Sequence, residues 1–212
     1  MVCPAARSKV YKAGISHQNQ YHHQQQLQSS TTLSSIFSTS STTFNLQDPA
    51  EGKPFGVLVV HSGSGVQNSG FNAAKGSLFA GLPSQNASCA RPEDGQTATF
   101  YIKDGALFLY DQSATPQEFY VDRSGMGQGK IGYTTGAQQP PKNAEQKGWS
   151  ISEQNYLQFD GSSPIACPNS IDGAYSIWAS AGVNNPAGNK DCVGIAAHVL
   201  ESTNPNACKY TE

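Results

Sequence analysis

Short runs of alternating apolar and polar residues recur from residue 55 onward, and turn-forming residues separate them. Alternation is typical of β-strands, because successive side chains of a strand point to opposite faces. The runs cover residues 55–60, 99–103, 106–110, 118–121, 130–133, 148–151, 156–159, 174–178 and 193–199. About ten short strands at this spacing predict a single all-β domain, either an antiparallel β-barrel or a β-sandwich. A weak similarity between residues 107–111 and 156–160 would suit a trefoil-like barrel.

The strongest local signal is the dipeptide Asp104-Gly105 between two strand-forming runs. Asp-Gly favours a type I′ turn, because both central residues of that turn need a positive φ. A two-residue turn also fixes the register of the hairpin. The predicted pairs are Phe100 with Leu109, Tyr101 with Phe108 and Ile102 with Leu107. The first and last pairs predict a core face, whereas Tyr101 and Phe108, with Tyr110 on the diagonal, predict an aromatic strip on the other face.

This aromatic strip has two interpretations once Tyr120 of a later strand is added to it. Aromatic rings usually bury their faces, which favours a second core layer beneath a loop. Flat rings also pack against the apolar face of a sugar, which favours a ligand-stacking surface. The residues of that possible surface are Tyr101, Phe108, Tyr110 and Tyr120.

Residues 1–43 differ in composition from the rest of the chain. They are rich in Gln, Ser and His, and they hold three basic residues but no Asp or Glu. Such a segment buries too little apolar surface to offset the entropy lost on ordering. We therefore predict a disordered tail followed by an all-β domain over residues 44–212. The tail shows no secretory signal, which suggests a pro-segment, a misassigned start or a stretch foreign to the native protein.

The composition excludes several classes of function. Charged residues make up 13% of the 212-residue chain and the net charge is −2, without a basic block, so we predict no nucleic-acid partner. No run approaches the roughly 20 apolar residues of a membrane-spanning helix, so no membrane insertion is predicted. No cofactor is predicted. Adjacent histidines in the tail (His17, His22 and His23) could bind a metal weakly, but a solvated polar tail is the simpler interpretation.

Four cysteines lie in the predicted domain, and a fifth, Cys3, lies in the tail. An even number without Cys-x-x-Cys spacing favours disulfides over a zinc site. We pair Cys167 with Cys192, because the strands between them should run back on each other; closing this loop stabilises by roughly 3–4 kcal/mol. Cys89 with Cys208 would then fasten the C-terminus, although three connectivities are formally possible. The alternative is four reduced cysteines in an intracellular protein.

The tripeptide Asn86-Ala-Ser is an N-glycosylation sequon in a turn-rich segment. A sequon is only used in a secreted protein, where the asparagine is modified on the surface. With the four cysteines, it favours an extracellular location.

The run Gly127-Gln-Gly-Lys-Ile-Gly132 matches the spacing of a dinucleotide-binding loop. That function needs a helix directly after the loop, whose N-terminus binds the pyrophosphate. The following residues include Pro140 and Pro141 and cannot form that helix. We therefore interpret the run as a glycine-rich hairpin loop.

Two kinds of catalytic arrangement can be assembled on paper. Ser64 lies close in sequence to His61, and His198 is the other histidine of the domain, but no Gly-x-Ser-x-Gly elbow is present. A histidine within a strand, such as His198, is more often structural. Paired carboxylates could hydrolyse a glycoside, and the candidates lie at strand ends and turns: Asp104, Asp111, Glu118, Asp122 and Asp160. No catalytic residue is predicted, because acids at such positions usually form turns.

The C-terminal half contains three distinctive segments, Ile165-Ala-Cys-Pro168, Tyr175-Ser-Ile-Trp178 and Asp191-Cys-Val-Gly-Ile-Ala196. Together they resemble the PhiA family of fungal cell wall proteins. Upstream, Ser77-Leu-Phe-Ala-Gly81 and the segment around Asn86-Ala-Ser-Cys89 look like the first cysteine region of that family, and Gln117-Glu-Phe-Tyr-Val-Asp122 looks like its central strand. The resemblance covers residues 43–200. That first region tends to hold two cysteines in the family, whereas this chain has one.

The resemblance implies a secreted protein of the fungal cell wall without an assigned reaction or catalytic residues. Similar secreted fungal proteins are elicitors of the plant hypersensitive response. We therefore expect a protein that acts by binding, with a plant cell-surface receptor or a fungal wall polysaccharide as partner. The alternatives are a secreted carbohydrate-active hydrolase and a module that binds wall polysaccharide.

Overall fold

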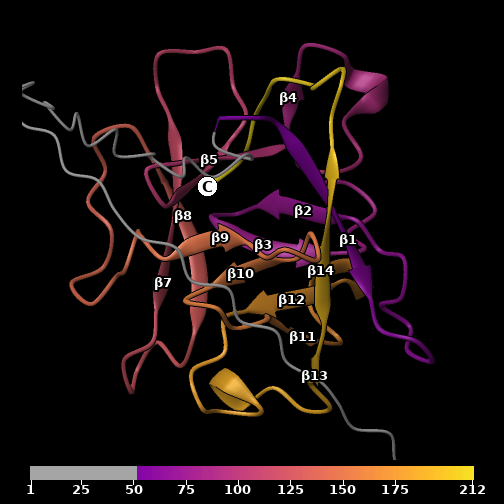
Figure 1. The fold of residues 1–212 in the computed structure, drawn as a ribbon, viewed down its shortest axis with the longest axis vertical. Helices are drawn as coiled ribbons and strands as arrows, with labels where there is room; N and C mark the ends of the chain where they lie inside the picture. The colour runs from indigo at the N-terminus through magenta and orange to yellow at the C-terminus, as the bar shows by residue number, and fades with distance from the viewer. Residues whose placement is uncertain (1–51) are drawn as a thin grey trace, which may run out of the picture. The chain divides into compact units, whose positions relative to one another are not determined.

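The computed structural model describes residues 52–212, so the predicted tail disorder and the histidines of the tail lie outside the described residues. This part of the chain forms fifteen β-strands and three short 3-10 turns, without an α-helix, which confirms the all-β class (Figure 1). The strands are β1 (Phe55–Val60), β2 (Phe71–Ala74), β3 (Ser77–Ala80), β4 (Ser88–Cys89), β5 (Phe100–Lys103), β6 (Ala106–Leu109), β7 (Gln117–Asp122), β8 (Lys130–Thr135), β9 (Trp149–Ile151), β10 (Leu157–Phe159), β11 (Ile165–Cys167), β12 (Tyr175–Trp178), β13 (Val193–Gly194), β14 (Ala196–Glu201) and β15 (Cys208–Lys209).

Eleven of these strands form one antiparallel sheet. Its order is β13-β11-β12-β3-β8-β7-β6-β5-β1-β14, and β2 pairs with β3 outside this path. Two further ladders, β9–β10 and β4–β15, have two strands each. The two ends of the path, β13 and β14, are neighbours in sequence and are separated by Ile195 alone. The choice between barrel and sandwich stays a prediction.

The β5–β6 hairpin forms as predicted. Asp104 and Gly105 have φ values of 52° and 75°, so both adopt the left-handed conformation that a type I′ turn needs. The three predicted pairs are the observed ones: Phe100 opposite Leu109, Tyr101 opposite Phe108 and Ile102 opposite Leu107. The first and last pairs are fully buried and form the core face of the hairpin.

An aromatic cluster around Phe119 of β7 forms the centre of the core. The centroid of its ring lies 5.8 Å from that of Phe100, 5.4 Å from Tyr133 and 6.4 Å from Trp149. All four side chains are buried. They come from β5, β7, β8 and β9, so the cluster packs the small β9–β10 ladder against the main sheet. Tilted and edge-to-face contacts of this kind add to the free energy gained by burying the rings.

The glycine-rich run is a hairpin loop, as predicted. Strands β7 and β8 pair antiparallel over their whole length, from Gln117 opposite Thr135 to Asp122 opposite Lys130. A strand, not a helix, therefore follows the loop, and nothing there presents a helix N-terminus to a phosphate. In Figure 1 these two strands stand side by side at the left.

The sequence analysis did not predict β4, β11 or β15, and the observed strands differ from the prediction in two further places. The hairpin β2–β3 was not predicted, because its turn, Lys75-Gly76, lacks the usual turn composition; both residues nevertheless have positive φ, 48° and 62°. The run 193–199, predicted as one strand, divides at Ile195, so that β13 pairs with β11 and β14 pairs with β1. The two segments that suggested a trefoil lie in different sheets, which gives that interpretation no support.

The four cysteines of residues 52–212 form two disulfides, Cys89–Cys208 and Cys167–Cys192, the pairs that the sequence analysis favours. The first fastens the β4–β15 ladder, in which Cys208 lies opposite Cys89. The second joins the end of β11 to the residue before β13. They span 119 and 25 residues of sequence, respectively.

We predict that Phe119→Ala lowers the free energy of unfolding by about 3–5 kcal/mol, because it removes a fully buried ring from the centre of the core. Denaturant titration monitored by circular dichroism measures the change. Leu200→Ala is the matched control: Leu200 is 47% exposed, and its truncation should cost no more than about 0.5 kcal/mol. Equal losses in the two variants would contradict this account of the core.

The two disulfides should contribute unequally to stability. On the chain-entropy model, a closed loop of 119 residues stabilises by about 5 kcal/mol and one of 25 residues by about 3.5 kcal/mol. We therefore expect Cys89→Ala/Cys208→Ala to lower the midpoint of urea unfolding more than Cys167→Ala/Cys192→Ala does. The reverse order would show that loop length does not determine the contribution of these bonds.

Candidate functional site

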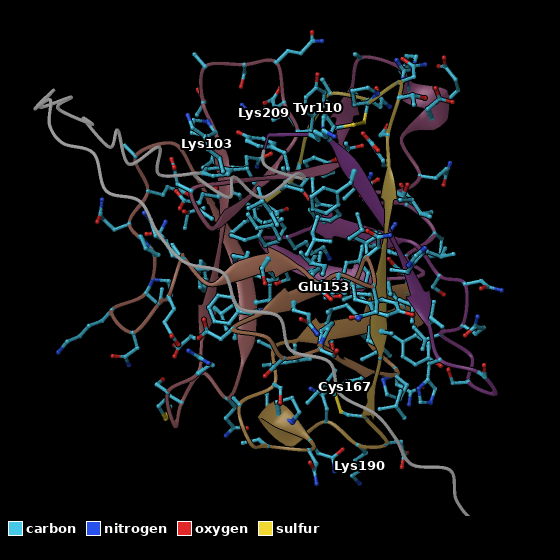
Figure 2. All side chains as sticks on the ribbon, viewed as in Figure 1. Lys103, Tyr110, Glu153, Cys167, Lys190 and Lys209 are labelled. Carbon is cyan, nitrogen blue, oxygen red and sulfur yellow. A yellow bond between two sulfur atoms is a disulfide. The ribbon has the colours of Figure 1, made fainter. Side chains whose placement is uncertain are left out.

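The outer surface of strands β5, β6, β7, β8 and β12 carries a band of aromatic and charged residues, which we call the aromatic face. On β5, β6 and β7 its members alternate with the buried residues of the same strand, so they point away from the Phe119 cluster. The aromatic face consists of Tyr101, Phe108, Glu118, Tyr120, Asp122, Lys130 and Trp178. Figure 2 shows the side chains on the ribbon.

The strand registers arrange these residues in rows across the sheet. One row holds Tyr101, Phe108 and Glu118, which lie opposite one another on β5, β6 and β7. The parallel row at the other end of β7 joins Asp122 to Lys130 of β8, and Lys130 to Trp178 of β12. Tyr120 lies between the two rows, opposite Gly132.

Tyr101 and Phe108 form a stacked pair. Their ring centroids are 5.1 Å apart and their planes differ by 14°, and both side chains stay partly exposed. Partial burial raises the pKa of the Tyr101 hydroxyl, and the nearby acids Glu118 and Asp111 raise it further. Glu118 itself has a raised pKa because of burial, opposed by Lys147. The stacked pair therefore presents two partly exposed, uncharged rings with an acid at their border.

Tyr110 and Tyr120 do not extend this stack. Tyr120 packs on the backbone of β8: a Cβ atom at Gly132 would lie 2.5 Å from its hydroxyl oxygen, so only glycine leaves room for the ring. Tyr110 lies beyond β6, and its carbonyl oxygen accepts the N–H of Cys208; Figure 2 places it near Lys209. Of the four residues predicted from sequence, the structure joins two in one ring contact.

A hollow of about 260 Å³ opens at the Asp122–Lys130–Trp178 row. Sequence reasoning identified Tyr120 as a ligand candidate and Asp122 as a catalytic candidate, but it missed Lys130 and Trp178. Ile177 and Trp178 are both buried, so alternation along β12 does not single out Trp178. Its place beside Lys130 depends on the pairing of β12 with β8, which no local pattern indicates. The hollow is lined by Tyr120, Asp122, Met126, Gly127, Lys130, Pro141, Trp178 and Ala187.

The glycines of the β7–β8 loop have a structural purpose. A Cβ atom at Gly127 would lie 2.2 Å from the carboxyl carbon of Asp122, and one at Gly129 would lie 2.1 Å from the carbonyl oxygen of Ala179. Gly129 also has a φ of 93°. The loop can therefore close against β7 and the end of β12 only with glycine at both positions. This close approach forms one wall of the hollow.

The structure does not bring the Ser/His candidates together. The Ser64 hydroxyl donates to the carbonyl oxygen of His61, 3.0 Å away, within its own turn. The Nδ1 atom of His61 lies 2.9 Å from the carbonyl oxygen of Gly194. His198 packs its ring against Tyr156, with centroids 5.7 Å apart. In the described residues, Ser64 thus makes no hydrogen bond to an imidazole.

The acidic candidates make contacts with different partners. Asp160 and Glu145 both bind the guanidinium of Arg123, which also lies 5.0 Å above the ring of Phe159. Arg123 lowers the pKa of Glu145 by a direct hydrogen bond. Glu118 and Asp122 share a face of β7, but four residues of strand separate them by about 13 Å. That exceeds the separation of about 5–9.5 Å that glycoside hydrolysis uses.

Asp104 and Asp111 occupy turns, as the sequence analysis expects of acids. Asp104 is the first residue of the β5–β6 turn, and Asp111 accepts the N–H of Ser113 at 3.0 Å. Within residues 52–212, no three His, Cys, Asp or Glu side chains gather as a metal site. No helix of this range is long and apolar enough to span a membrane.

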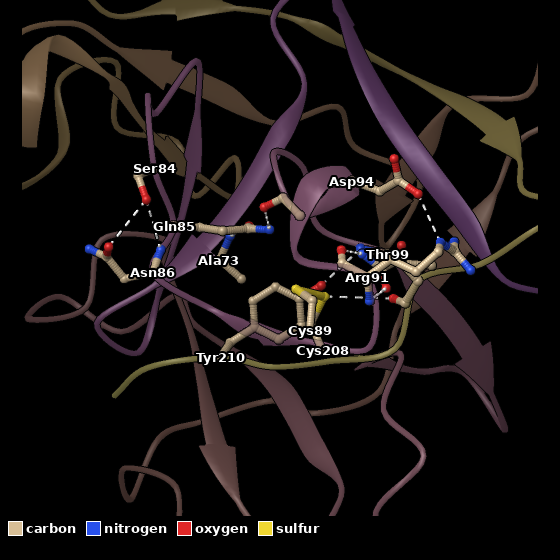
Figure 3. Close-up of a disulfide and its surroundings, with 12 residues drawn as sticks. Ala73, Ser84, Gln85, Asn86, Cys89, Arg91, Asp94, Thr99, Cys208 and Tyr210 are labelled. Carbon is tan, nitrogen blue, oxygen red and sulfur yellow. Dashed lines mark hydrogen bonds and ion pairs between the residues drawn. A yellow bond between two sulfur atoms is a disulfide. The ribbon is translucent and has the colours of Figure 1, made fainter.

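The sequon residue Asn86 lies on the surface near the Cys89–Cys208 disulfide (Figure 3). Its side chain points away from that disulfide, and its Oδ1 atom accepts a hydrogen bond from the Ser84 hydroxyl at 3.2 Å. On the other side of the disulfide, Arg91 binds Asp94 at 2.8 Å. The asparagine is therefore placed where a transferred glycan would project into solvent.

Taken together, two disulfides within residues 52–212 and an all-β fold define the class of the protein, a disulfide-bonded all-β domain of the kind found outside the cell. Comparison with known proteins gives the family. The chain matches the family of PhiA-like secreted proteins over residues 55–211 and belongs to it. It is accordingly a secreted protein of the fungal cell wall, as the sequence analysis predicted.

Several relatives carry the name cell wall protein phiA. The protein of Aspergillus niger is 69% identical over 164 residues, which cover 77% of this chain and 89% of the relative. That of Emericella nidulans is 64% identical over the same shares of both chains. That of Arthroderma benhamiae is 41% identical over 155 residues, which cover 69% of this chain and 81% of the relative. No solved structure matches this chain.

We predict that Asn86 carries an N-linked glycan when the protein is secreted by a eukaryotic host. Treatment with an N-glycosidase should lower the intact mass of the wild-type protein by the mass of one glycan. The same treatment should leave the mass of Asn86→Gln unchanged. Asn155→Gln alters an exposed asparagine outside any sequon and should leave the glycan in place. A wild-type mass unaffected by the enzyme would contradict the prediction.

Proposed function

We propose that this protein acts in the fungal cell wall by binding polysaccharide, without turnover, and that the aromatic face is the binding surface. The observation that carries the proposal is the stacked pair Tyr101–Phe108, which stays partly exposed on the outside of the sheet. An uncharged planar surface of this kind packs well against the apolar ring hydrogens of a sugar. The fungal wall offers such sugars in long repeated chains.

The location and the charge of the protein support a polysaccharide as the partner. The family is secreted and its relatives are named as cell wall proteins, so the surface is exposed to wall polymers. The aromatic face carries charges of both signs, Glu118 and Asp122 against Lys130, and therefore no strong field that would select an anionic or cationic partner. Neutral glycans fit this balance better than nucleic acids or anionic lipids.

Binding without catalysis is supported by the contacts that the catalytic candidates make. The Ser64 hydroxyl donates to the carbonyl oxygen of His61 and not to its ring, and the rings of His61 and His198 contact Gly194 and Tyr156. Asp160 is held by Arg123, and the two acids of the aromatic face lie about 13 Å apart. A secreted hydrolase would need two of these groups in one cleft.

We predict that Tyr101→Ala and Phe108→Ala each weaken binding to purified wall polysaccharide about tenfold, because each removes half of the stacked platform. Co-sedimentation with insoluble β-glucan and with chitin, tested separately, measures the change. Tyr156→Ala is the matched control, since Tyr156 is also a partly exposed tyrosine packed on a single ring, that of His198. If wild type binds neither polymer, the proposed function is wrong.

We further propose that plant tissue recognises the protein as an elicitor of defence, the role that the family resemblance suggests. Its secretion and surface exposure support access to a plant cell-surface receptor. Infiltration of leaves with folded protein should cause local cell death, whereas protein that has been reduced and alkylated at its four domain cysteines should not. A response to both forms would show that a peptide epitope suffices, and a response to neither would overturn the proposal.

A further inference from the structure

The hollow at the end of β7 away from the stacked pair contains two opposite charges that lie opposite each other on neighbouring strands without forming an ion pair. Asp122 of β7 lies directly opposite Lys130 of β8. The Asp122 carboxylate instead accepts the N–H of Ser124 at 2.9 Å. The Lys130 ammonium donates to the hydroxyl of Ser77 at 2.6 Å. No carboxylate of residues 52–212 lies within ion-pair distance of Lys130.

The surroundings of Lys130 hold its ammonium in place. The Nζ atom lies 5.7 Å from the centre of the Trp178 ring, a cation–π contact. The indole N–H donates to the Ser176 hydroxyl at 3.0 Å, which fixes the ring. Trp178 is only 9% exposed, so it forms the floor beneath Lys130 and offers little surface for stacking. Burial also lowers the pKa of Lys130.

The other wall of the hollow is equally fixed. Gly127 packs directly against the Asp122 carboxyl group, and its N–H donates to the Ser124 hydroxyl at 3.2 Å. Tyr120 lies between the charged row and the stacked pair, with its ring packed over Gly132. A carboxylate, an ammonium and an aromatic ring therefore converge on one small space. Its volume of about 260 Å³ is below the usual range of drug-sized pockets, roughly 300–1,000 Å³.

From this arrangement we infer that the hollow is a subsite for a single neutral, hydroxyl-rich sugar unit of the polysaccharide chain. One sugar hydroxyl donates to the Asp122 carboxylate, another sugar oxygen accepts from the Lys130 ammonium, and the apolar side of the ring faces Tyr120. The inference rests on the proposed function and adds the class of sugar. A charged sugar is attracted by one of the two side chains and repelled by the other, so it gains no net charge interaction to offset the hydration it loses. A neutral sugar loses less hydration and can hydrogen-bond to both side chains.

Specificity among charged sugars gives the sharpest test. The probes are a neutral β-glucose trisaccharide, a uronic acid trisaccharide and a glucosamine trisaccharide, measured by calorimetry at low salt. Wild type should bind the neutral probe at least tenfold more tightly than either charged one. Asp122→Asn should weaken binding of the neutral trisaccharide about tenfold. It should also reduce the ratio of the affinity for the neutral trisaccharide to the affinity for the uronic acid trisaccharide. Lys130→Met should reduce the ratio of the affinity for the neutral trisaccharide to the affinity for the glucosamine trisaccharide.

Two matched controls separate the subsite from a structural role. Asp111→Asn changes a carboxylate that likewise accepts the N–H two residues along, at 3.0 Å, but does not line the hollow. Lys103→Met changes an exposed lysine on β5 of the same sheet. Both should keep the affinities and the order of preference of wild type. Because the test compares probes on one variant, partial loss of folded protein does not imitate the result.

The outcomes distinguish this inference from the function on which it rests. In one outcome, wild type binds polysaccharide and Tyr101→Ala does not, while Asp122→Asn and Lys130→Met keep the wild-type preference among the trisaccharides. The subsite is then wrong, but the aromatic face remains the binding surface. If wild type binds no wall polymer and no trisaccharide, both fail. If the charged trisaccharides bind as well as the neutral one, the hollow does not select by charge and the inference is overturned.

Discussion

Alternation along β5–β8 is the constraint on which the rest of the structure depends. The rings of Phe100 and Phe119 are fully buried, and this burial fixes which side of each strand faces the core. Every other residue then has to face outward, which places Tyr101, Phe108, Tyr120 and Asp122 on one surface. A slip of one residue would exchange the two sets. The stability of the core and the composition of the aromatic face are therefore consequences of the same register.

The glycines of β8 and of the β7–β8 loop are as important for the packing around the hollow as the aromatic rings are. Gly132 admits the Tyr120 ring, and Gly127 and Gly129 let the β7–β8 loop close against Asp122 and the end of β12. A sequence that looks like a nucleotide-binding motif thus serves close packing around the hollow. The Cys167–Cys192 disulfide closes the segment that contains Trp178 and Ala187 of the hollow, whereas Cys89–Cys208 fastens the β4–β15 ladder.

Sequence reasoning succeeded where the determinants are local. The Asp104-Gly105 turn sets its own hairpin, and the two strands around the glycine-rich loop are predicted by their alternation. It failed where strands that are distant in sequence pair with each other. Strand β12 pairs with β3 and β8, and only this pairing brings Trp178 beside Lys130. The β2–β3 hairpin was missed because Lys75 adopts a positive φ that its residue type does not favour. Tyr110 follows the predicted alternation, yet makes no ring contact with the other aromatic residues of the face in the described structure.

The most direct test of the account is to map a bound glycan on the molecule. Heteronuclear NMR of ¹⁵N- and ¹³C-labelled protein, titrated with a soluble neutral β-glucan oligosaccharide, reports which residues change environment. We expect the shifts to cluster on the outward residues of β5–β8 and at the end of β12, with the buried aromatic cluster unchanged. Shifts confined to another surface, such as the groove around Arg91 and Asn204, would contradict the assignment of function to the aromatic face.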